Sequence, residues 1–368
     1  MLHYQYTEHD VIFTLPYRGD ELYLVGTFSN WQKQAAFKFE KNGNGFVLRK
    51  TRNELNKIGN SGYIEYCLWG DDASQPLPFN NEYPVGYYFN SQSFDSQGNG
   101  GCNYLLLPEN ISQTELFQIA EDSQCSFKVK QSAAEFSSEY TLANFRQVEG
   151  GNIAEGNLFR SYHPLVPSRS EHVALCDVEV QRQGVAMKLL ERHGVRTVIN
   201  LSETSQQLAS YIRSAPASYY KTLWLEQQVV NVPVAYETVY FMSDRDESFN
   251  AEELGFQSGI RAVIRYIADN PGPYHVHCRL GSDRTGVIIG FLQLLMGADK
   301  AQIRQNYLQT NKMAIGEYRS FRLLEQALCR ALGEDCFDND VVAKRYLPSL
   351  GLSGAVIDKA CRNLACNA

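Results

Sequence analysis

The first hundred residues carry short runs of β-branched, aromatic and aliphatic side chains, separated by residues that favour turns. Residues 11–15 and 63–69 are two such runs, and an Asn-Gly-Asn-Gly turn at 42–45 lies between two more. Runs of this kind predict strands, and an Asn-Gly pair between them is a strong signal for a hairpin. We therefore expect an all-β sandwich over residues 1–107.

The pattern changes from residue 139 onward, where apolar runs alternate with segments of helical spacing. Strands are expected at 195–201, 228–234 and 274–277, and helices at 179–192, 206–213, 251–270, 299–310 and 317–332. This alternation predicts an α/β domain over residues 139–368. The polar stretch 108–138 has weak periodicity, so we expect a linker or an extra strand there.

Composition limits the class of protein. Hydrophobic residues make up 44% and charged residues 20% of the 368 positions, which is typical of a globular protein. The net charge of −7 argues against a nucleic-acid partner. No run approaches the roughly 20 apolar residues of a membrane span, and residues 1–10 show no secretory signal, so we expect a cytoplasmic protein.

The nine cysteines are irregularly spaced. None forms a C-x-x-C pair, which argues against a zinc site and predicts no metal ligand set. Scattered cysteines around a reactive thiol suit a reducing compartment.

The stretch 274–286 is expected to form a short strand, a polar loop and the first turn of an apolar helix. Its side chains and backbone groups are suited to binding a phosphate. Backbone N–H groups at a loop and helix start bind phosphate and favour the thiolate of Cys278. Arg284 can hold two phosphate oxygens in a planar fork. Thr285 can donate its hydroxyl to the Cys278 sulfur, and a charged His277 would help to lower the pKa of the Cys278 thiol. The residues expected to surround a phosphate are Arg279, Leu280, Gly281, Ser282 and Gly286.

This stretch resembles the Cys-X5-Arg signature of the protein tyrosine phosphatase superfamily. Residues 144–146 (Asn-Phe-Arg), 158–161 (Leu-Phe-Arg-Ser) and 198–201 (Val-Ile-Asn-Leu) resemble, in order, motifs of its atypical bacterial tyrosine, dual-specificity and phosphoinositide branch. The resemblance implies a phosphotyrosine-phosphatase-like fold and hydrolysis through a phosphocysteine, without metal or cofactor. Asn200, Ser202 and Ser282 depart from the usual Asp, Arg and Lys. Either an active-site role or a structural ion pair would explain Arg146 and Arg160.

The leaving oxygen of such a reaction needs a general acid. In the superfamily an Asp usually lies on a loop before the helix that precedes the phosphate loop. Asp246 is the first candidate by this criterion, with Asp244 beside it. Asp283, inside the phosphate loop, is the competitor, since some relatives use an Asp at that place.

Residues 26–31 and 63–66 resemble the glycogen-binding modules of the AMP-activated kinase β-subunit type. That resemblance implies an immunoglobulin-like, carbohydrate-binding-module-like fold and makes a glycan a candidate partner. Trp31 matches a tryptophan that stacks on sugar rings, whereas Cys67 stands where the modules carry a Lys.

Four functions follow from these features. The first is a tyrosine or dual-specificity protein phosphatase acting on phosphorylated proteins or small phosphomonoesters. A phosphoinositide or inositol phosphate phosphatase is the second, although Ser282 removes a helpful cation. The domain order also resembles laforin-like glucan phosphatases, whose loop differs at Leu280 and Asp283. A non-enzymatic phosphate- or glycan-binding protein is the alternative from another class.

Overall fold

The computed structural model describes residues 4–29, 32–55, 63–71, 87–88, 102–106, 129–170, 175–240, 242–244, 253–315 and 319–366. Its contacts divide the chain into two compact units: Met1–Val129 with Ala314–Leu323, and Lys130–Met313 with Leu324–Ala368. The stretch 108–128 of the expected linker lies outside the described residues. The expected domain boundaries therefore stay predictions.

The first unit contains two antiparallel four-stranded sheets. One has the order β1 (Tyr4–Tyr6), β2 (Asp10–Leu15), β5 (Gly45–Thr51), β4 (Glu40–Asn42), and the other β3 (Tyr23–Gly26), β6 (Tyr63–Trp69), β8 (Cys102–Leu106), β7 (Tyr87–Tyr88). In its described residues these sheets are accompanied by the short helices η1 (Thr27–Ser29), η2 (Ala35–Phe37) and α1 (Arg52–Leu55). The predicted hairpin is confirmed, because Asn42 pairs with Gly45 and Gly43 takes the left-handed φ of +58° that glycine favours.

Both sheets contribute to one core. Phe13 of β2 and Tyr66 of β6 are fully buried, and their rings meet edge to face with centroids 5.6 Å apart. Leu24 and Leu68, register partners on β3 and β6, belong to the same cluster. The expectation of a β-rich first unit with antiparallel strands is thus confirmed.

The second unit is built on a five-stranded sheet of order β12 (Val229–Asn231), β11 (Thr197–Asn200), β13 (Tyr274–His277), β10 (Leu158–Ser161), β9 (Arg146–Gln147). The first four strands in this order are parallel, and β9 pairs antiparallel with β10. Strands β11 and β12 are shorter than predicted. The carboxyl ends of the parallel strands meet at one edge of the sheet, which is where α/β proteins place ligand sites.

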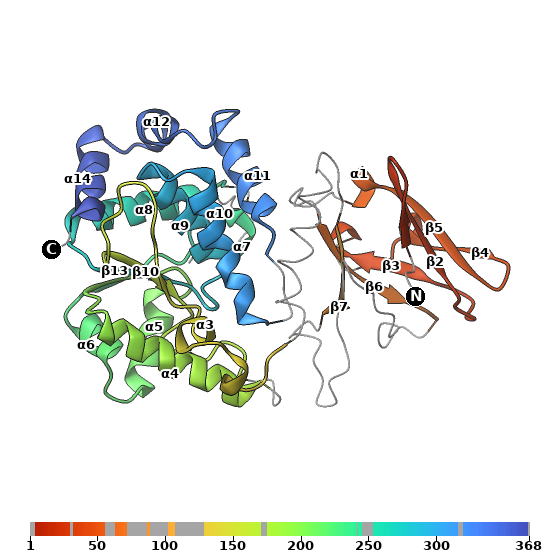
Figure 1. Ribbon diagram of the computed structural model, residues 1–368, viewed down its shortest axis with the longest axis horizontal. Coiled ribbons are helices and arrows are strands. Elements are labelled where there is room, and N and C mark those ends of the chain that lie inside the picture. Colours follow the sequence, from red (N-terminus) through yellow and green to blue (C-terminus); the bar gives the residue numbers. More distant parts are fainter. Residues whose placement is uncertain are drawn as a thin grey trace. The chain divides into compact units, whose positions relative to one another are not determined.

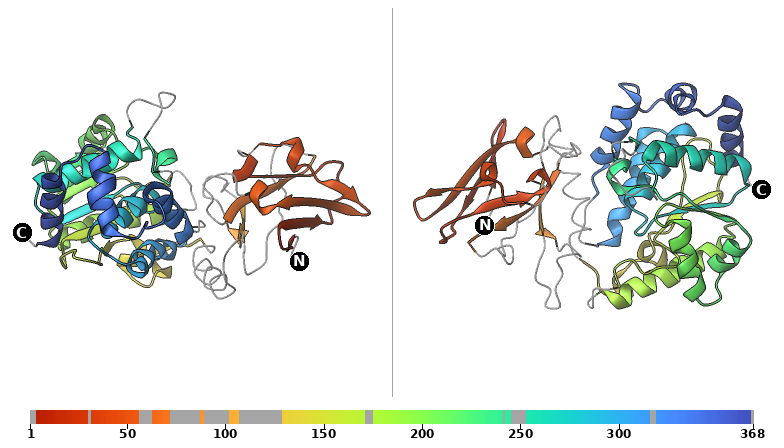
Figure 2. Two further views of the ribbon diagram at one scale, coloured as in Figure 1. Left: turned by 90° about the horizontal axis from the view of Figure 1, so that it is seen from above. Right: turned by 180° about the vertical axis from the view of Figure 1, so that it is seen from behind.

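Helices cover both faces of this sheet, so the predicted α/β class is confirmed. Figures 1 and 2 show α4 (Cys176–Arg192), α5 (Ser205–Ser214) and α6 (Tyr219–Leu225) on one side, and α8 (Phe256–Asp269) and α9 (Asp283–Leu295) on the other. The remaining helices are η4 (Ala133–Glu135), α3 (Glu139–Leu142), α7 (Tyr236–Val239), α10 (Lys300–Leu308), η5 (Gln309–Met313), α11 (Phe321–Leu332), α12 (Asn339–Val341), η6 (Val342–Tyr346), α13 (Leu347–Ser349) and α14 (Gly354–Ala365).

The helix termini follow the local sequence. Thr204 caps α5 and Asp299 caps α10, each accepting the N–H three residues on, while a Gln at that position bonds back to the cap. Helix α9 is different, since its residues from Thr285 to Leu295 are all buried and it begins without a side-chain cap. Its uncapped start lies where the phosphate loop ends.

Cys329 in α11 and Cys336 form a disulfide bond, a pairing that the irregular cysteine spacing did not predict. Among the described residues, no helix combines the length and the hydropathy needed to cross a bilayer.

Candidate active site

The loop between β13 and α9 starts at the carboxyl edge of the sheet. Strand β13 ends at His277 and α9 begins at Asp283, so the loop consists of Cys278 and the four residues that follow it. Gly281 has a φ of +70°, and a Cβ there would lie 2.1 Å from the carbonyl oxygen of Ser161. The expected glycine is therefore required both by conformation and by space.

Groups outside the loop hold the carbonyls of Arg279 and Leu280. The Arg279 carbonyl accepts hydrogen bonds from the His163 N–H (3.1 Å) and the Ser168 hydroxyl (3.0 Å). The Leu280 carbonyl accepts one from the side-chain amide of Asn144 (3.1 Å). Since all three donors lie on other segments, these carbonyls point outward from the loop.

The Gly281 carbonyl is held in the same way, by Asn144 at 3.2 Å and by Nη2 of Arg160 at 2.6 Å. In a trans peptide the N–H points opposite to the carbonyl of the preceding residue. The N–H groups of Leu280, Gly281 and Ser282 therefore point inward, and they donate to no group in the described part of the chain. Successive inward N–H groups beside a helix start form an anion site.

The side chains of the loop add further polar atoms. Cys278 is buried, with 4% of its surface exposed. The hydroxyls of Ser282 and Thr285 are buried and have no hydrogen-bond partner among the described residues. The expected bond from Thr285 to the sulfur is therefore not formed. Buried polar groups without partners are rare, so both hydroxyls have unused capacity for an oxyanion.

Arg284 lies in the first turn of α9, next to the loop, as predicted. Its Nη1 donates to the carbonyls of Leu201 (3.3 Å) and Val234 (3.4 Å), which follow β11 and β12. Both bonds are long and go to neutral acceptors. A phosphate is a stronger partner for a guanidinium because the hydrogen bond is then assisted by charge on both sides.

His277 is neutral, so the expectation that its charge stabilises the thiolate is wrong. Burial lowers its pKa well below the ordinary value, and the nearby His163 and His275 lower it further. Its Nδ1 lies 3.3 Å from the Cys278 carbonyl, which can only accept, so Nδ1 donates and Nε2 accepts from the Tyr220 hydroxyl at 3.0 Å. Its role in this arrangement is to fix the start of the loop.

Two of the three candidate acids lie on the segment after α7. Asp246 falls outside the described residues. Asp244 is exposed, and its carboxylate accepts from the N–H (3.2 Å) and the hydroxyl (2.9 Å) of Ser258 in the first turn of α8. Its position is that of a residue that caps a helix.

Asp283, the third candidate, lies at the start of α9 with 8% of its surface exposed. Its Oδ1 accepts from the hydroxyl of Tyr240 at 2.8 Å, and that hydroxyl lies 2.7 Å from the hydroxyl of Tyr307. The structure thus places one of the predicted acids beside Arg284, at the helix start that directly follows the loop.

The residues predicted to contact substrate differ from one another in their exposure. Arg279 is exposed, and its guanidinium makes no hydrogen bond or ion pair within the described ranges. Leu280 is half-buried, and a Cβ at Gly286 would lie 2.9 Å from the ring of Tyr307. Trp31 lies outside the described residues.

Sequence reasoning left an active-site role open for Arg146 and Arg160, but it missed Asn144, His163 and Ser168, which also support the loop from outside. Asn144 and Arg160 are part of the matched motifs, so their position in those motifs was a usable signal. Arg146 bonds the Asn144 carbonyl (3.1 Å) and the Asn306 carbonyl (2.9 Å), and it forms no ion pair in the described part of the chain. Among the described residues, neither Arg146 nor Arg160 forms the structural ion pair that the sequence left open. His163 carried no sequence signal.

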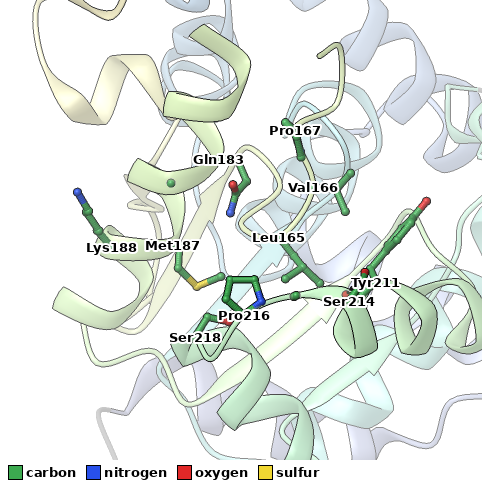
Figure 3. A pocket seen from close by; sticks show the side chains of 12 residues that line it. Leu165, Val166, Pro167, Gln183, Met187, Lys188, Tyr211, Ser214, Pro216 and Ser218 are labelled. Carbon is green, nitrogen blue, oxygen red and sulfur yellow. Dashed lines mark hydrogen bonds between the residues drawn. The ribbon is translucent and has the colours of Figure 1, made fainter. Parts of the chain in front are cut away.

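A groove of about 460 Å³ flanks the segment that supports the loop. Its walls come from α4, from α5 and the turn after it, and from residues 165–167, which lie between the two residues that bond the Arg279 carbonyl. Figure 3 shows Leu165, Met187 and Pro216 gathered in it, with Lys188 pointing outward. It does not include Cys278.

No group of three or more His, Cys, Asp or Glu residues within the described ranges is arranged to hold a metal ion.

Comparison with known proteins finds a family match and two similar solved structures. A family model described as the tyrosine phosphatase family matches residues 140–331. The core catalytic domain of the PP-IP phosphatase SIW14 from S. cerevisiae, solved in complex with citrate, is 15% identical; the match covers 54% of this chain and 94% of that chain, with a TM-score of 0.28. A second structure of the Siw14 catalytic core is 14% identical, with coverages of 54% and 97% and the same TM-score. No curated protein matches the chain.

Proposed function

Because the chain belongs to the tyrosine phosphatase family, we propose that its second unit dephosphorylates phosphotyrosine or other phosphorylated residues of proteins through a phosphocysteine at Cys278. The observation that carries this proposal is the set of inward N–H groups of Leu280, Gly281 and Ser282 beside that thiol. Donors fixed before the reaction stabilise the charge that develops on the phosphoryl oxygens.

The reaction proceeds in two displacements. The Cys278 thiolate attacks phosphorus, the bond to the leaving oxygen breaks, and a general acid gives that oxygen a proton. Water then attacks the phosphocysteine and gives a proton to the carboxylate that the acid has become; the S–P bond breaks, and inorganic phosphate leaves with the thiolate and the acid restored. Arg284 and the loop N–H groups hold the equatorial oxygens through both steps.

We propose Asp283 as the general acid. It lies at the start of α9, directly after the loop and beside Arg284, whereas Asp244 is exposed and is used to cap α8. The hydroxyl of Tyr240 can donate to the Asp283 carboxylate or accept from the protonated carboxyl, so their contact can persist in both protonation states. Asp246 is the competing assignment.

A substrate with several phosphates, such as an inositol phosphate or a phosphoinositide headgroup, is the second candidate. It is favoured by the exposed guanidinium of Arg279, which has no partner in the described part of the chain and lies one residue after the nucleophile. A cation at that place can bind an anionic group next to the phosphate being cleaved. Ser282 argues in the opposite direction because it supplies no charge.

For the first unit we propose an immunoglobulin-like, carbohydrate-binding-module-like sandwich that binds a glycan through Trp31, which would also permit a phosphorylated glucan as substrate. Two antiparallel sheets around one core are compatible with this proposal. Sedimentation with amylose, comparing wild type with Trp31→Ala, tests it: retention that does not depend on Trp31 would contradict the assignment.

Phosphate release from a phosphotyrosyl peptide, inositol phosphates, phosphoinositides and a phosphorylated glucan tests the proposed reaction. We expect the highest kcat/KM on the peptide and a loss of at least about 10³-fold in Cys278→Ser. Equal release by Cys278→Ser would exclude the phosphocysteine. A higher kcat/KM on an inositol phosphate would instead support the second candidate.

A further inference from the structure

Arg160 is a fully buried arginine in β10, behind the phosphate loop. Its Nη2 donates to the carbonyls of Gly281 (2.6 Å) and Ser282 (3.4 Å), and its Nη1 donates to Oδ1 of Asn306 (3.0 Å). It forms no ion pair with a carboxylate among the residues described. Arg182 is almost equally buried, but it forms an ion pair with Glu179.

A buried charge without an anionic partner is costly, so something else must compensate it. Burial lowers the pKa of Arg160 to about 10, although the negative charge of a Cys278 thiolate acts against that shift. The side chain is therefore still protonated at neutral pH. A second cation, the half-buried Arg146, lies nearby, and desolvation followed by the charge of Arg160 lowers its pKa well below the ordinary value. Two positive charges thus lie behind the loop, and the negative charges that can balance them are the Cys278 thiolate, the Asp283 carboxylate and an anion bound in the loop.

We infer that Arg160 is a positioning residue of the phosphate loop: it holds the Gly281 and Ser282 carbonyls outward, and its buried charge stabilises the oxyanion bound beside Cys278. This inference rests on the proposed function and extends it to a residue that does not touch the substrate.

The geometric part follows from the peptide plane. While the Gly281 carbonyl is bonded to Arg160, the Ser282 N–H points into the loop. Without the guanidinium, only the longer hydrogen bond from Asn144 (3.2 Å) still holds that carbonyl outward, and an inward rotation would turn it toward the anion and remove the Ser282 N–H as a donor. The electrostatic part requires only the charge, so a lysine should restore some of it but cannot reproduce the planar fork.

Calorimetric binding of tungstate, a tetrahedral dianion, tests both parts in a Cys278→Ser background, where no turnover intervenes. We expect Arg160→Gln to weaken the Kd by about 100-fold and Arg160→Lys by about tenfold, as for the loss of charge-assisted contacts in a preorganised anion site. Arg182→Gln is the matched control: it should lower the Tm but leave the Kd within about threefold, since Arg182 bonds Leu142 and Met313 instead of the loop.

An Arg160→Gln protein that folds and binds tungstate within about threefold of its parent overturns the inference. If that variant does not fold, Asn306→Ala decides, because it removes the acceptor of Nη1 and keeps the arginine; an unchanged Kd there overturns the inference as well. Failure of the proposed function can be distinguished from failure of this inference. A protein that needs Arg160 to bind tungstate, but releases no phosphate from any substrate, contradicts only the proposed hydrolysis.

Discussion

The Tyr240 hydroxyl lies 2.8 Å from Oδ1 of Asp283 and joins the end of α7 to the first turn of α9. The Tyr307 hydroxyl, 2.7 Å from that of Tyr240, extends the contact to α10. Asp283 is therefore held in one orientation by Tyr240, which lies 43 positions before it in the chain, and through it by Tyr307, which lies 24 positions after it. A fixed carboxyl beside Arg284 is what proton delivery to a leaving group requires.

Replacing Asp283 by Asn should lower kcat by about 10²–10³-fold with an alkyl phosphate and much less with p-nitrophenyl phosphate, whose leaving group needs little protonation. The pH dependence of kcat should lose its basic limb. Asp244→Asn is the control, since its carboxylate caps α8; it should keep both limbs. Loss of the basic limb in Asp246→Asn, with Asp283→Asn normal, would move the role to Asp246.

Tyr240→Phe removes the hydroxyl and leaves the ring. We expect kcat on alkyl phosphates to fall by about tenfold or less, because the acid is still present but no longer oriented. The tungstate Kd should not change, as Tyr240 bonds the acid and not the loop N–H groups. Stopped-flow or steady-state rates on both leaving-group classes measure the effect; an equal loss on p-nitrophenyl phosphate would show that Tyr240 acts on the nucleophilic step instead.

The local pattern was sufficient for the loop and its flanking elements. A strand, a polar stretch with Gly281 and an apolar helix follow from hydrophobic periodicity over a few residues. The loop's orientation was not predictable, because its carbonyls are held by His163 and Asn144, more than a hundred residues earlier in the chain. The sequence could not predict that His277 is neutral for a related reason, because its neutrality depends on complete burial by elements distant in the chain.

The buried histidines predict that acid destabilises the second unit. Burial lowers the pKa of His275 to about 3, against about 6.5 in an unfolded chain. Between these values the unfolded chain binds a proton that the folded form does not. The free energy of unfolding should therefore fall as pH drops below about 6.5, by up to about 1.4 kcal/mol per pH unit for each such histidine.

Glu203 adds to this loss at lower pH. Burial alone would raise the pKa of Glu203, but the charge and hydrogen bond of His163 and the hydrogen bond of Ser202 lower it to about 2. Its contribution is present above the unfolded value of about 4.3 and is lost as pH falls further. Urea unfolding from about pH 7.5 to about pH 4.5 measures the slope that the histidines cause, and its extension to about pH 3 measures the loss from Glu203. His275→Gln should flatten it, and the exposed His9→Gln should not; an equal slope in both variants would contradict the assignment.

Arg279→Ala distinguishes the two substrate classes. If the exposed guanidinium binds a second anionic group, the variant should raise KM for an inositol polyphosphate by about tenfold with kcat little changed, and the salt dependence of kcat/KM should weaken. Hydrolysis of p-nitrophenyl phosphate, which has one phosphate, should be unaffected. Lys188→Ala removes an exposed cation at the groove and serves as the matched control. An Arg279→Ala enzyme with unchanged KM for every polyanion would leave Arg279 without a role in specificity and would favour the phosphotyrosyl substrate.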